Sequence, residues 1–194
     1  MFKECLDSVK ENSPLIHNIT NYVTVNDVAN AILAVGASPI MADEKKEAAE
    51  ITSICNGLNI NIGTLNRNTI RAMFAAGKKA QSLNHKILLD PVGAGASTLR
   101  TKTALALISK IKFDVIRGNI SEIKTLATGS GKTKGVDANI EDAVSESNLE
   151  SAVAFAKNFA EKQNCVVAIT GAIDLVSDGK NALSSETANR RWDA

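Results

Sequence analysis

Aromatic residues are scarce in this chain, and neither sign of charge is in excess. Phe, Trp and Tyr make up 4% of the 194 residues, and the formal net charge at pH 7 is +1. A near-neutral chain lacks the basic surface that usually attracts nucleic acid or anionic membranes. Few aromatic side chains are present to stack on bases. We therefore expect neither nucleic-acid binding nor membrane-surface binding.

Metal-binding cysteine motifs, a signal sequence and long apolar runs are also missing. Cys5, Cys55 and Cys165 are odd in number and lack metal-ligand spacing. The first residues of the chain include acidic ones, where a signal peptide would be basic and then apolar. No stretch approaches the roughly 20 apolar residues of a membrane-spanning helix. These absences predict a cytoplasmic protein.

Short apolar runs alternate with longer stretches of helical periodicity along the chain. The expected strands are residues 15–19, 38–42, 58–62, 86–90, 114–116 and 165–169. The expected helices are residues 24–35, 45–55, 67–83, 101–111, a segment after Asn119, and 149–163. This alternation predicts one α/β domain with a mostly parallel sheet, right-handed crossovers and helices on both faces.

Ligands of such sheets bind at the carboxyl ends of the strands, so the residues at those ends are the candidates for a site. Several are glycines, which let backbone N–H groups approach a ligand without a Cβ in the way. These glycines are Gly63, Gly93, Gly95, Gly118 and Gly171. Thr170 adds a hydroxyl, and the guanidinium of Arg117 suits phosphate oxygens.

Two carboxylates at strand ends, Asp90 and Glu122, are hard oxygen ligands of the kind that magnesium prefers. Each also has a purely structural interpretation. Asp90 precedes a proline and can be a turn former, and Glu122 can be a favourable charge in the first turn of its helix. Because these residues gather at one edge of one sheet, a nucleotide–magnesium site is the better explanation.

The tripeptide at residues 131–133, Gly-Lys-Thr, looks like the end of a phosphate-binding P-loop. The complete motif requires a glycine at position 126, which is Leu126 here. The tripeptide also follows a helical stretch, whereas a P-loop joins a strand to a helix. We reject it as a nucleotide-binding motif.

Seven short blocks follow one another between about Ser13 and Gly179. They are residues 16–23 (Ile-His-Asn-Ile-Thr-Asn-Tyr-Val), 36–42, 61–65, 89–96 (Leu-Asp-Pro-Val-Gly-Ala-Gly-Ala), 116–123 (Ile-Arg-Gly-Asn-Ile-Ser-Glu-Ile), 134–137 and 168–171. Each block alone is only moderately specific, but together and in this order they resemble the hydroxyethylthiazole kinase family. The resemblance implies the three-layer ribokinase-like α/β fold.

The resemblance also implies an activity, which is phosphorylation of 4-methyl-5-(2-hydroxyethyl)thiazole with ATP and magnesium in thiamine diphosphate biosynthesis. It places the thiazole among Asn21, Val23, Met41 and Gly63, although Met41 alone could equally be a core residue. In the same way it assigns Arg117 and Thr170 to the ATP phosphates, and Asp90 and Glu122 to magnesium. It further implies a homotrimer with active sites at the subunit interfaces. It provides no role as a base for His17, which we interpret as structural.

One family motif has no counterpart in these 194 residues. The family has a Gly-Thr-Gly-Cys turn at a helix N-terminus, where N–H groups bind the transferring phosphoryl group and the cysteine takes the place of the catalytic base. This sequence has no such motif, so no base is assigned. We therefore expect an incomplete kinase domain at residues 1–180 and a divergent tail at residues 181–194.

Two alternatives to a thiazole kinase stay open at this point. The absent motif favours a truncated remnant that binds nucleotide or thiazole without phosphoryl transfer. A related hydroxymethylpyrimidine-type kinase is the nearest enzyme alternative, but the blocks at residues 18–21 and 38–41 speak against it.

Overall fold

The computed structural model describes residues 2–129 and 143–186. The chain divides into two compact units, the first made of Met1–Asp90 with Ala106–Phe113 and the second of Pro91–Leu105 with Asp114–Ala194. The tripeptide at residues 131–133 and most of the expected tail, residues 187–194, lie outside the described residues.

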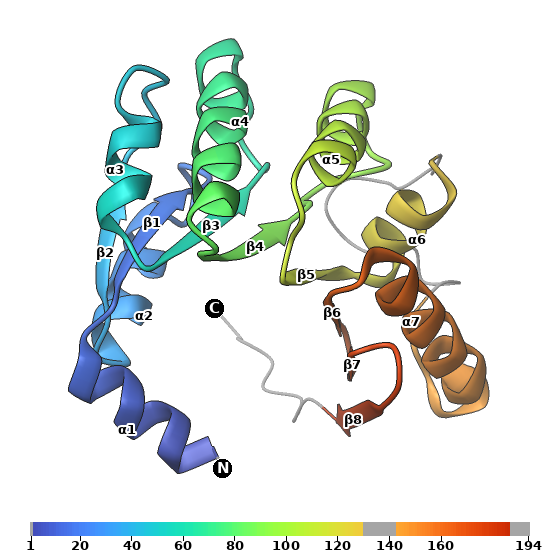
Figure 1. Ribbon diagram of the computed structural model, residues 1–194. Coiled ribbons are helices and arrows are strands. Elements are labelled where there is room, and N and C mark those ends of the chain that lie inside the picture. Colours follow the sequence, from blue (N-terminus) through green and yellow to red (C-terminus); the bar gives the residue numbers. More distant parts are fainter. Residues whose placement is uncertain (1, 130–142, 187–194) are drawn as a thin grey trace. The chain divides into compact units, whose positions relative to one another are not determined.

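Four parallel strands form the sheet of the first unit, in the order β2-β1-β3-β4 (Figure 1). Their bounds are β1 (Leu15–Ile19), β2 (Ser38–Met41), β3 (Gly57–Asn61) and β4 (Lys86–Asp90). β2 is an edge strand and contains Pro39, which an edge tolerates because one side of the strand needs no ladder hydrogen bonds. The carboxyl ends of all four strands point the same way, as the site requires.

Helices cover both faces of this sheet. They are α2 (Val25–Ala34), α3 (Ala48–Ile54) and α4 (Arg67–Ser82), while α1 (Phe2–Asn12) precedes β1 and extends beyond the sheet (Figure 1). α3 and α4 lie side by side, and α2 packs on β2 (Figure 1). The chain reverses its direction across the sheet at β2, so right-handed crossovers put α2 on the face opposite α3 and α4.

The core of the first unit follows from the sequence pattern. β3 and β4 bury Leu58, Ile60 and Leu89, and α4 turns Ala72, Ala76 and Ala80 inward at four-residue spacing, so that small side chains let the helix approach the sheet closely. The residues of this unit that are fully or almost fully buried include Ile19, Leu58, Ile60, Ala72, Met73, Ala76, Ala80, Ile87 and Leu89. The buried residues of α4 form the apolar stripe expected of a helix that packs one face on a sheet.

The second unit contains two parallel strands followed by an antiparallel hairpin. β5 (Val115–Asn119) pairs in parallel with β6 (Val166–Thr170), and β7 (Ile173–Ser177) pairs antiparallel with β6 and with β8 (Ala182–Glu186). Residues 182–186, which we expected to belong to a divergent tail, therefore form the second strand of a hairpin.

The helices of the second unit are α6 (Ile120–Thr128) and α7 (Leu149–Gln163), preceded by a short 3-10 helix at Glu146–Asn148. α7 packs on β6, β7 and β8, and α6 packs on β5 and β6. Helix α5 (Thr98–Lys110) begins in the second unit and ends in the first. No helix in the described ranges has both the length and the apolar composition needed to cross a membrane.

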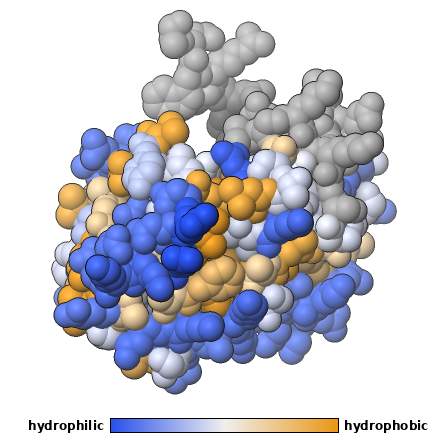
Figure 2. All heavy atoms as spheres, turned by 90° about the horizontal axis from the view of Figure 1, so that it is seen from above, coloured by the Kyte–Doolittle hydropathy of each residue, from blue (hydrophilic) through white to orange (hydrophobic). Residues whose placement is uncertain are grey.

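Figure 2 shows one face of the molecule, where hydrophilic side chains predominate and hydrophobic ones gather in groups between them. Large hydrophobic side chains that are exposed on the described residues include Tyr22, Val23, Leu33, Val35 and Met41. All five belong to the first unit and lie on or next to α2 and β2.

Candidate active site

A pocket of about 120 Å³ opens at the carboxyl ends of β1 and β2 in the first unit. Its walls are Asn18, Thr20, Tyr22, Val25, Met41, Ala42 and Asp43. The hydroxyl of Tyr22 donates a 2.6 Å hydrogen bond to Oδ2 of Asp43, and this bond raises the pKa of Tyr22 above its ordinary value. Met41 ends β2 and is 37% exposed, so it is a wall of the pocket rather than a core residue.

Asn21 holds the turn that leads from β1 into α2. Its Oδ1 accepts hydrogen bonds from the backbone N–H groups of Val23 and Thr24, both at 3.1 Å, and from the hydroxyl of Thr24 at 3.2 Å. Its Nδ2 donates to Oδ1 of Asn61 at 3.2 Å. The Val23 side chain is 84% exposed. Of the four expected thiazole contacts, only Met41 is among the residues that line the pocket.

Gly63 has no room for a side chain. A Cβ on this residue would lie 2.9 Å from Cβ of Asn21 and 3.0 Å from Oδ1 of Asn61. Its backbone N–H donates to Oδ1 of Asn61 at 2.9 Å. Gly63 and Asn21, two of the expected contacts, are therefore held side by side by the same amide of Asn61.

Asp90 lies at the end of β4, and its carboxylate belongs to the same network. Nδ2 of Asn61 donates to Oδ2 of Asp90 at 2.9 Å. The backbone carbonyl of Asp90 accepts from the N–H of Ile62 at 3.2 Å, which continues the pairing of β3 and β4 by one residue. The expected magnesium residue of the first unit is thus linked through Asn61 to two expected thiazole residues.

Glu122, the expected magnesium residue of the second unit, is 4% exposed and caps the start of α6. Its Oε2 accepts from the N–H of Asn119 at 2.8 Å, while Oδ1 of Asn119 accepts from the N–H of Glu122 at 2.9 Å. Its Oε1 accepts from the N–H of Gly93 at 2.7 Å. Gly118 leaves space for this carboxylate, because a Cβ there would lie 3.0 Å from Oε2.

The glycine N–H groups at the strand ends are largely used within the protein. Gly63 donates to Asn61 and Gly93 to Glu122, as described above, while Gly95 donates to the hydroxyl of Thr101 at 2.8 Å and Gly171 to Asp174 at 2.9 Å. In this conformation these four N–H groups therefore face side-chain acceptors of the protein itself. Their physical role is to let the chain turn closely around a side-chain acceptor.

The two expected ATP residues lie on neighbouring strands of the second unit. Arg117 is exposed on β5 and pairs in register with Ala168, while Thr170 ends β6 and pairs with Asn119. The hydroxyl of Thr170 is 3.5 Å from the carbonyl oxygen of Gly118, which is a long hydrogen bond. Thr170 is therefore at the carboxyl end of its strand, whereas Arg117, expected at a strand end, is the middle residue of β5.

Arg100 is a further basic residue at this site that the sequence did not single out. Gly93 has a φ of +71°, and a Cβ there would lie 2.3 Å from Nη1 of Arg100. The guanidinium therefore packs against Gly93, next to the loop that Glu122 holds. The position of the Arg100 guanidinium depends on the left-handed backbone conformation of Gly93. No pattern in the sequence predicts that conformation.

Asp90 and Glu122 each offer carboxylate oxygens, the donor type that magnesium prefers. Magnesium usually keeps several waters and uses one or two carboxylates together with substrate phosphates. Asp90 ends β4, whereas Glu122 lies in the first turn of α6, where both of its oxygens already accept backbone N–H groups. Within residues 2–129 and 143–186, no group of three or more His, Cys, Asp or Glu side chains is placed to hold a metal by itself.

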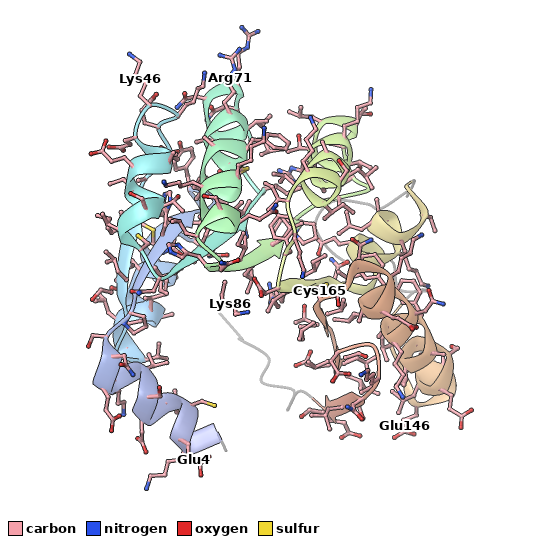
Figure 3. The ribbon with its side chains drawn as sticks, in the orientation of Figure 1. Glu4, Lys46, Arg71, Lys86, Glu146 and Cys165 are labelled. Atoms are coloured by element: carbon pink, nitrogen blue, oxygen red, sulfur yellow. The ribbon has the colours of Figure 1, made fainter. Side chains whose placement is uncertain are left out.

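His17 and Cys165 are not available as catalytic bases. His17 is fully buried, with Nδ1 2.9 Å from the hydroxyl of Thr52 and Nε2 2.7 Å from the carbonyl oxygen of Ala42, which confirms a structural histidine. Burial lowers its pKa. Cys165 precedes β6, at the amino end of that strand (Figure 3). Burial, together with the charge of Asp114, raises the pKa of its thiol to about 11.

Comparison with known proteins identifies the relatives of this chain. The model of the hydroxyethylthiazole kinase family matches residues 6–190, which include β8. The hydroxyethylthiazole kinase of Clostridium acetobutylicum is 59% identical over 189 residues, or 97% of this chain and 69% of the relative. The chain spans about two thirds of the length of the curated relatives it matches.

Solved structures give the same result. The hydroxyethylthiazole kinase of Pyrococcus horikoshii OT3 has a TM-score of 0.81 and 40% identity, with 93% of this chain and 65% of that chain covered. A ribokinase-like superfamily protein of Enterococcus faecalis shares the fold, with a TM-score of 0.57 and 9% identity over 93% of this chain and 65% of its own. The predicted three-layer α/β fold with a mostly parallel sheet is confirmed, and the chain belongs to the hydroxyethylthiazole kinase family.

Proposed function

We propose that this protein transfers the γ-phosphoryl group of ATP to the hydroxyl of 4-methyl-5-(2-hydroxyethyl)thiazole, a step of thiamine diphosphate biosynthesis. The observation that carries the proposal is the pocket beside Met41, in a chain of this family. Its 120 Å³ is small compared with the roughly 300–1,000 Å³ of pockets for larger ligands, which suits a single substituted ring. The use of ATP also favours a cytoplasmic location.

The residues around the pocket suit a thiazole that carries a short alcohol. Met41 offers a flexible, polarizable side chain against the ring. Asn21, Val23 and Gly63 are the other proposed thiazole residues, and Asn21 and Gly63 lie at the adjacent strand ends. The rigid turn around them would orient the hydroxyethyl group for in-line attack on the phosphorus.

The second unit supplies the proposed contacts to ATP. The guanidinium of Arg117 would bind phosphate oxygens and stabilise the charge that spreads over them during transfer, and Thr170 would donate its hydroxyl. Asp90 and Glu122 are the proposed magnesium residues, reaching the ion directly or through its water. Magnesium, when bound, neutralises phosphate charge. No residue of this chain is proposed as the catalytic base.

We also propose that the protein is a homotrimer with the thiazole pocket at a subunit interface. Helix α2 supports this proposal, because most of its ten residues are apolar and none of them is buried. The neighbouring Tyr22 and Val23 are 60% and 84% exposed beside the pocket. One side of α2 packs on β2, and apolar side chains left exposed on the other side are typical of a surface that a second copy buries.

A direct assay tests the proposed reaction. The purified protein is incubated with ATP, magnesium and the thiazole alcohol, and ADP release and the phosphorylated product are measured. Hydroxymethylpyrimidine serves as the control substrate. Thiazole phosphorylation at an ordinary enzymic rate supports the proposal and excludes a binding-only protein. Turnover of the pyrimidine alone would overturn the substrate, and binding of both ligands without turnover would favour a non-catalytic thiazole- and nucleotide-binding protein.

A further inference from the structure

Asn61 is the residue that joins the two halves of the hydrogen-bond network in the first unit. It is the last residue of β3 and is 8% exposed. Its Oδ1 accepts from the N–H of Gly63 at 2.9 Å and from Nδ2 of Asn21 at 3.2 Å. Its Nδ2 donates to the carboxylate of Asp90 at 2.9 Å. One amide therefore contacts neighbours from three strand ends.

Only one orientation of this amide satisfies its neighbours. A carboxylate oxygen only accepts, so the NH₂ group must face Asp90, and the backbone N–H of Gly63 only donates, so Oδ1 must face that residue. A rotation by 180° would set oxygen against carboxylate and NH₂ against N–H. The Asn61 side chain thus has a defined orientation and can transmit it to its partners.

The partners of Asn61 are proposed to bind different ligands. Asn21 and Gly63 lie on the thiazole side, and Asn21 also holds the first turn before α2. Asp90 lies on the magnesium and phosphate side. A carboxylate at the end of a strand can rotate, and a hydrogen bond from a nearly buried amide limits that rotation.

We propose that Asn61 is a positioning residue, which holds the Asp90 carboxylate in the orientation that binds magnesium–ATP and keeps it in register with Asn21 and Gly63. The inference rests on the proposed function for the roles of Asp90, Asn21 and Gly63. It goes beyond that function by assigning the alignment of the two ligands to an amide that need touch neither of them.

The first experiment compares Asn61→Leu with the matched variant Asn59→Leu. Asn59 lies on the same strand, and its amide donates to Oδ1 of Asn18 at 3.1 Å. Calorimetry of the full chain measures the Kd of magnesium–ATP and of the thiazole alcohol. Loss of a hydrogen bond to a charged group predicts a Kd for magnesium–ATP about tenfold higher or more in Asn61→Leu. Asn59→Leu should change it less than about twofold, because the amide of Asn59 bonds a neutral side chain and not Asp90.

A double-mutant cycle then decides whether Asn61 acts through Asp90. In the Asp90→Ala background, Asn61→Leu should change the Kd of magnesium–ATP by less than about twofold, because the group that it orients is gone. An equal effect of Asn61→Leu with and without Asp90 would overturn the proposal, as would no effect in either background. Asn61→Ser, which is too short to span the same partners, repeats the cycle if the leucine variant does not fold.

Crystal structures of the wild type and of the Asn61 variant separate this inference from the proposed function. The Asp90 carboxylate should leave its wild-type orientation in the variant, whether or not a ligand is bound. An unchanged Asp90 would overturn the positioning role. If the wild type binds neither magnesium–ATP nor the thiazole alcohol, the proposed function fails, and the orientation of Asp90 still decides the role of Asn61.

Discussion

At the scale of single residues, the exposed guanidinium of Arg117 carries the clearest prediction for ATP binding. Arg117→Ala should weaken ATP binding by roughly 10- to 100-fold, since hydrogen bonds to charged groups contribute about 1.5–3 kcal/mol. Calorimetric titration with magnesium–ATP measures this change. Arg71→Ala is the control, because Arg71 extends from α4 away from the sheet of the first unit (Figure 3). An unchanged affinity in Arg117→Ala would remove this residue from the site.

Gly63 gives a second prediction at this scale. Gly63→Ala would place a Cβ 2.9 Å from Cβ of Asn21 and 3.0 Å from Oδ1 of Asn61. Overpacking of this kind costs about 1–3 kcal/mol, so the midpoint of chemical denaturation should fall. Gly171→Ala is a matched control, because its nearest contact would be an ordinary 3.6 Å to the carbonyl oxygen of Ile173. Equal stability of the two variants would contradict the close packing at Gly63.

Residue types at strand ends were predictable from the sequence, but their partners were not. Asp90 and Thr170 end β4 and β6, as strand–helix alternation predicts, because carboxyl ends of parallel strands collect ligand-binding groups. Arg117 instead lies in the middle of β5, and Glu122 lies in the first turn of α6. Asn61 was missed as a functional residue because its role depends on three strand ends that are distant in sequence. The involvement of Glu122 in a cap was foreseeable, since Asn119 and Glu122 have the three-residue spacing of a capping box.

At the scale of secondary-structure elements, Glu122 should stabilise the start of α6 in the absence of any ligand. Glu122→Gln would replace one carboxylate oxygen, which accepts a hydrogen bond, with an NH₂ group, which donates. That NH₂ group would then face the backbone N–H of Gly93 or of Asn119. A buried polar group left without its partner costs about 1–3 kcal/mol. Urea denaturation of the ligand-free protein measures the loss, with Glu50→Gln, in the first turn of α3, as the control. Full stability of Glu122→Gln would mean that this carboxylate is not a structural cap.

Most elements followed from apolar periodicity, and the exceptions have physical reasons. α7 has the predicted bounds, and β1 and β4 do as well. β8 was not predicted because all but its first residue are exposed, so it has no apolar pattern to recognise. α1 was not predicted either, since its charged residues were used only to judge a signal peptide. The antiparallel pairing of β7 with β6 and β8 depends on short connections rather than on the strands' own composition.

At the scale of the whole molecule, the uncovered face of α2 predicts self-association. Leu33 is 56% exposed on this helix, and Val35, just after it, is 41% exposed. If these side chains are buried between copies, the wild type should have about three times the 20.5 kDa mass of one chain in light scattering. Leu33→Lys should lower that mass toward a single chain, because a charge cannot be buried unpaired in an apolar interface.

The control for this prediction is Leu83→Lys, which changes another exposed leucine of the first unit, at the end of α4. It should leave the mass unchanged. If the thiazole pocket lies at the same interface, Leu33→Lys should also weaken thiazole binding while Leu83→Lys does not, because Tyr22 and Val25 in the pocket wall lie at the start of the α2 face. A monomeric wild type, or a trimer that Leu33→Lys leaves intact, would show that α2 is not the surface that joins the copies.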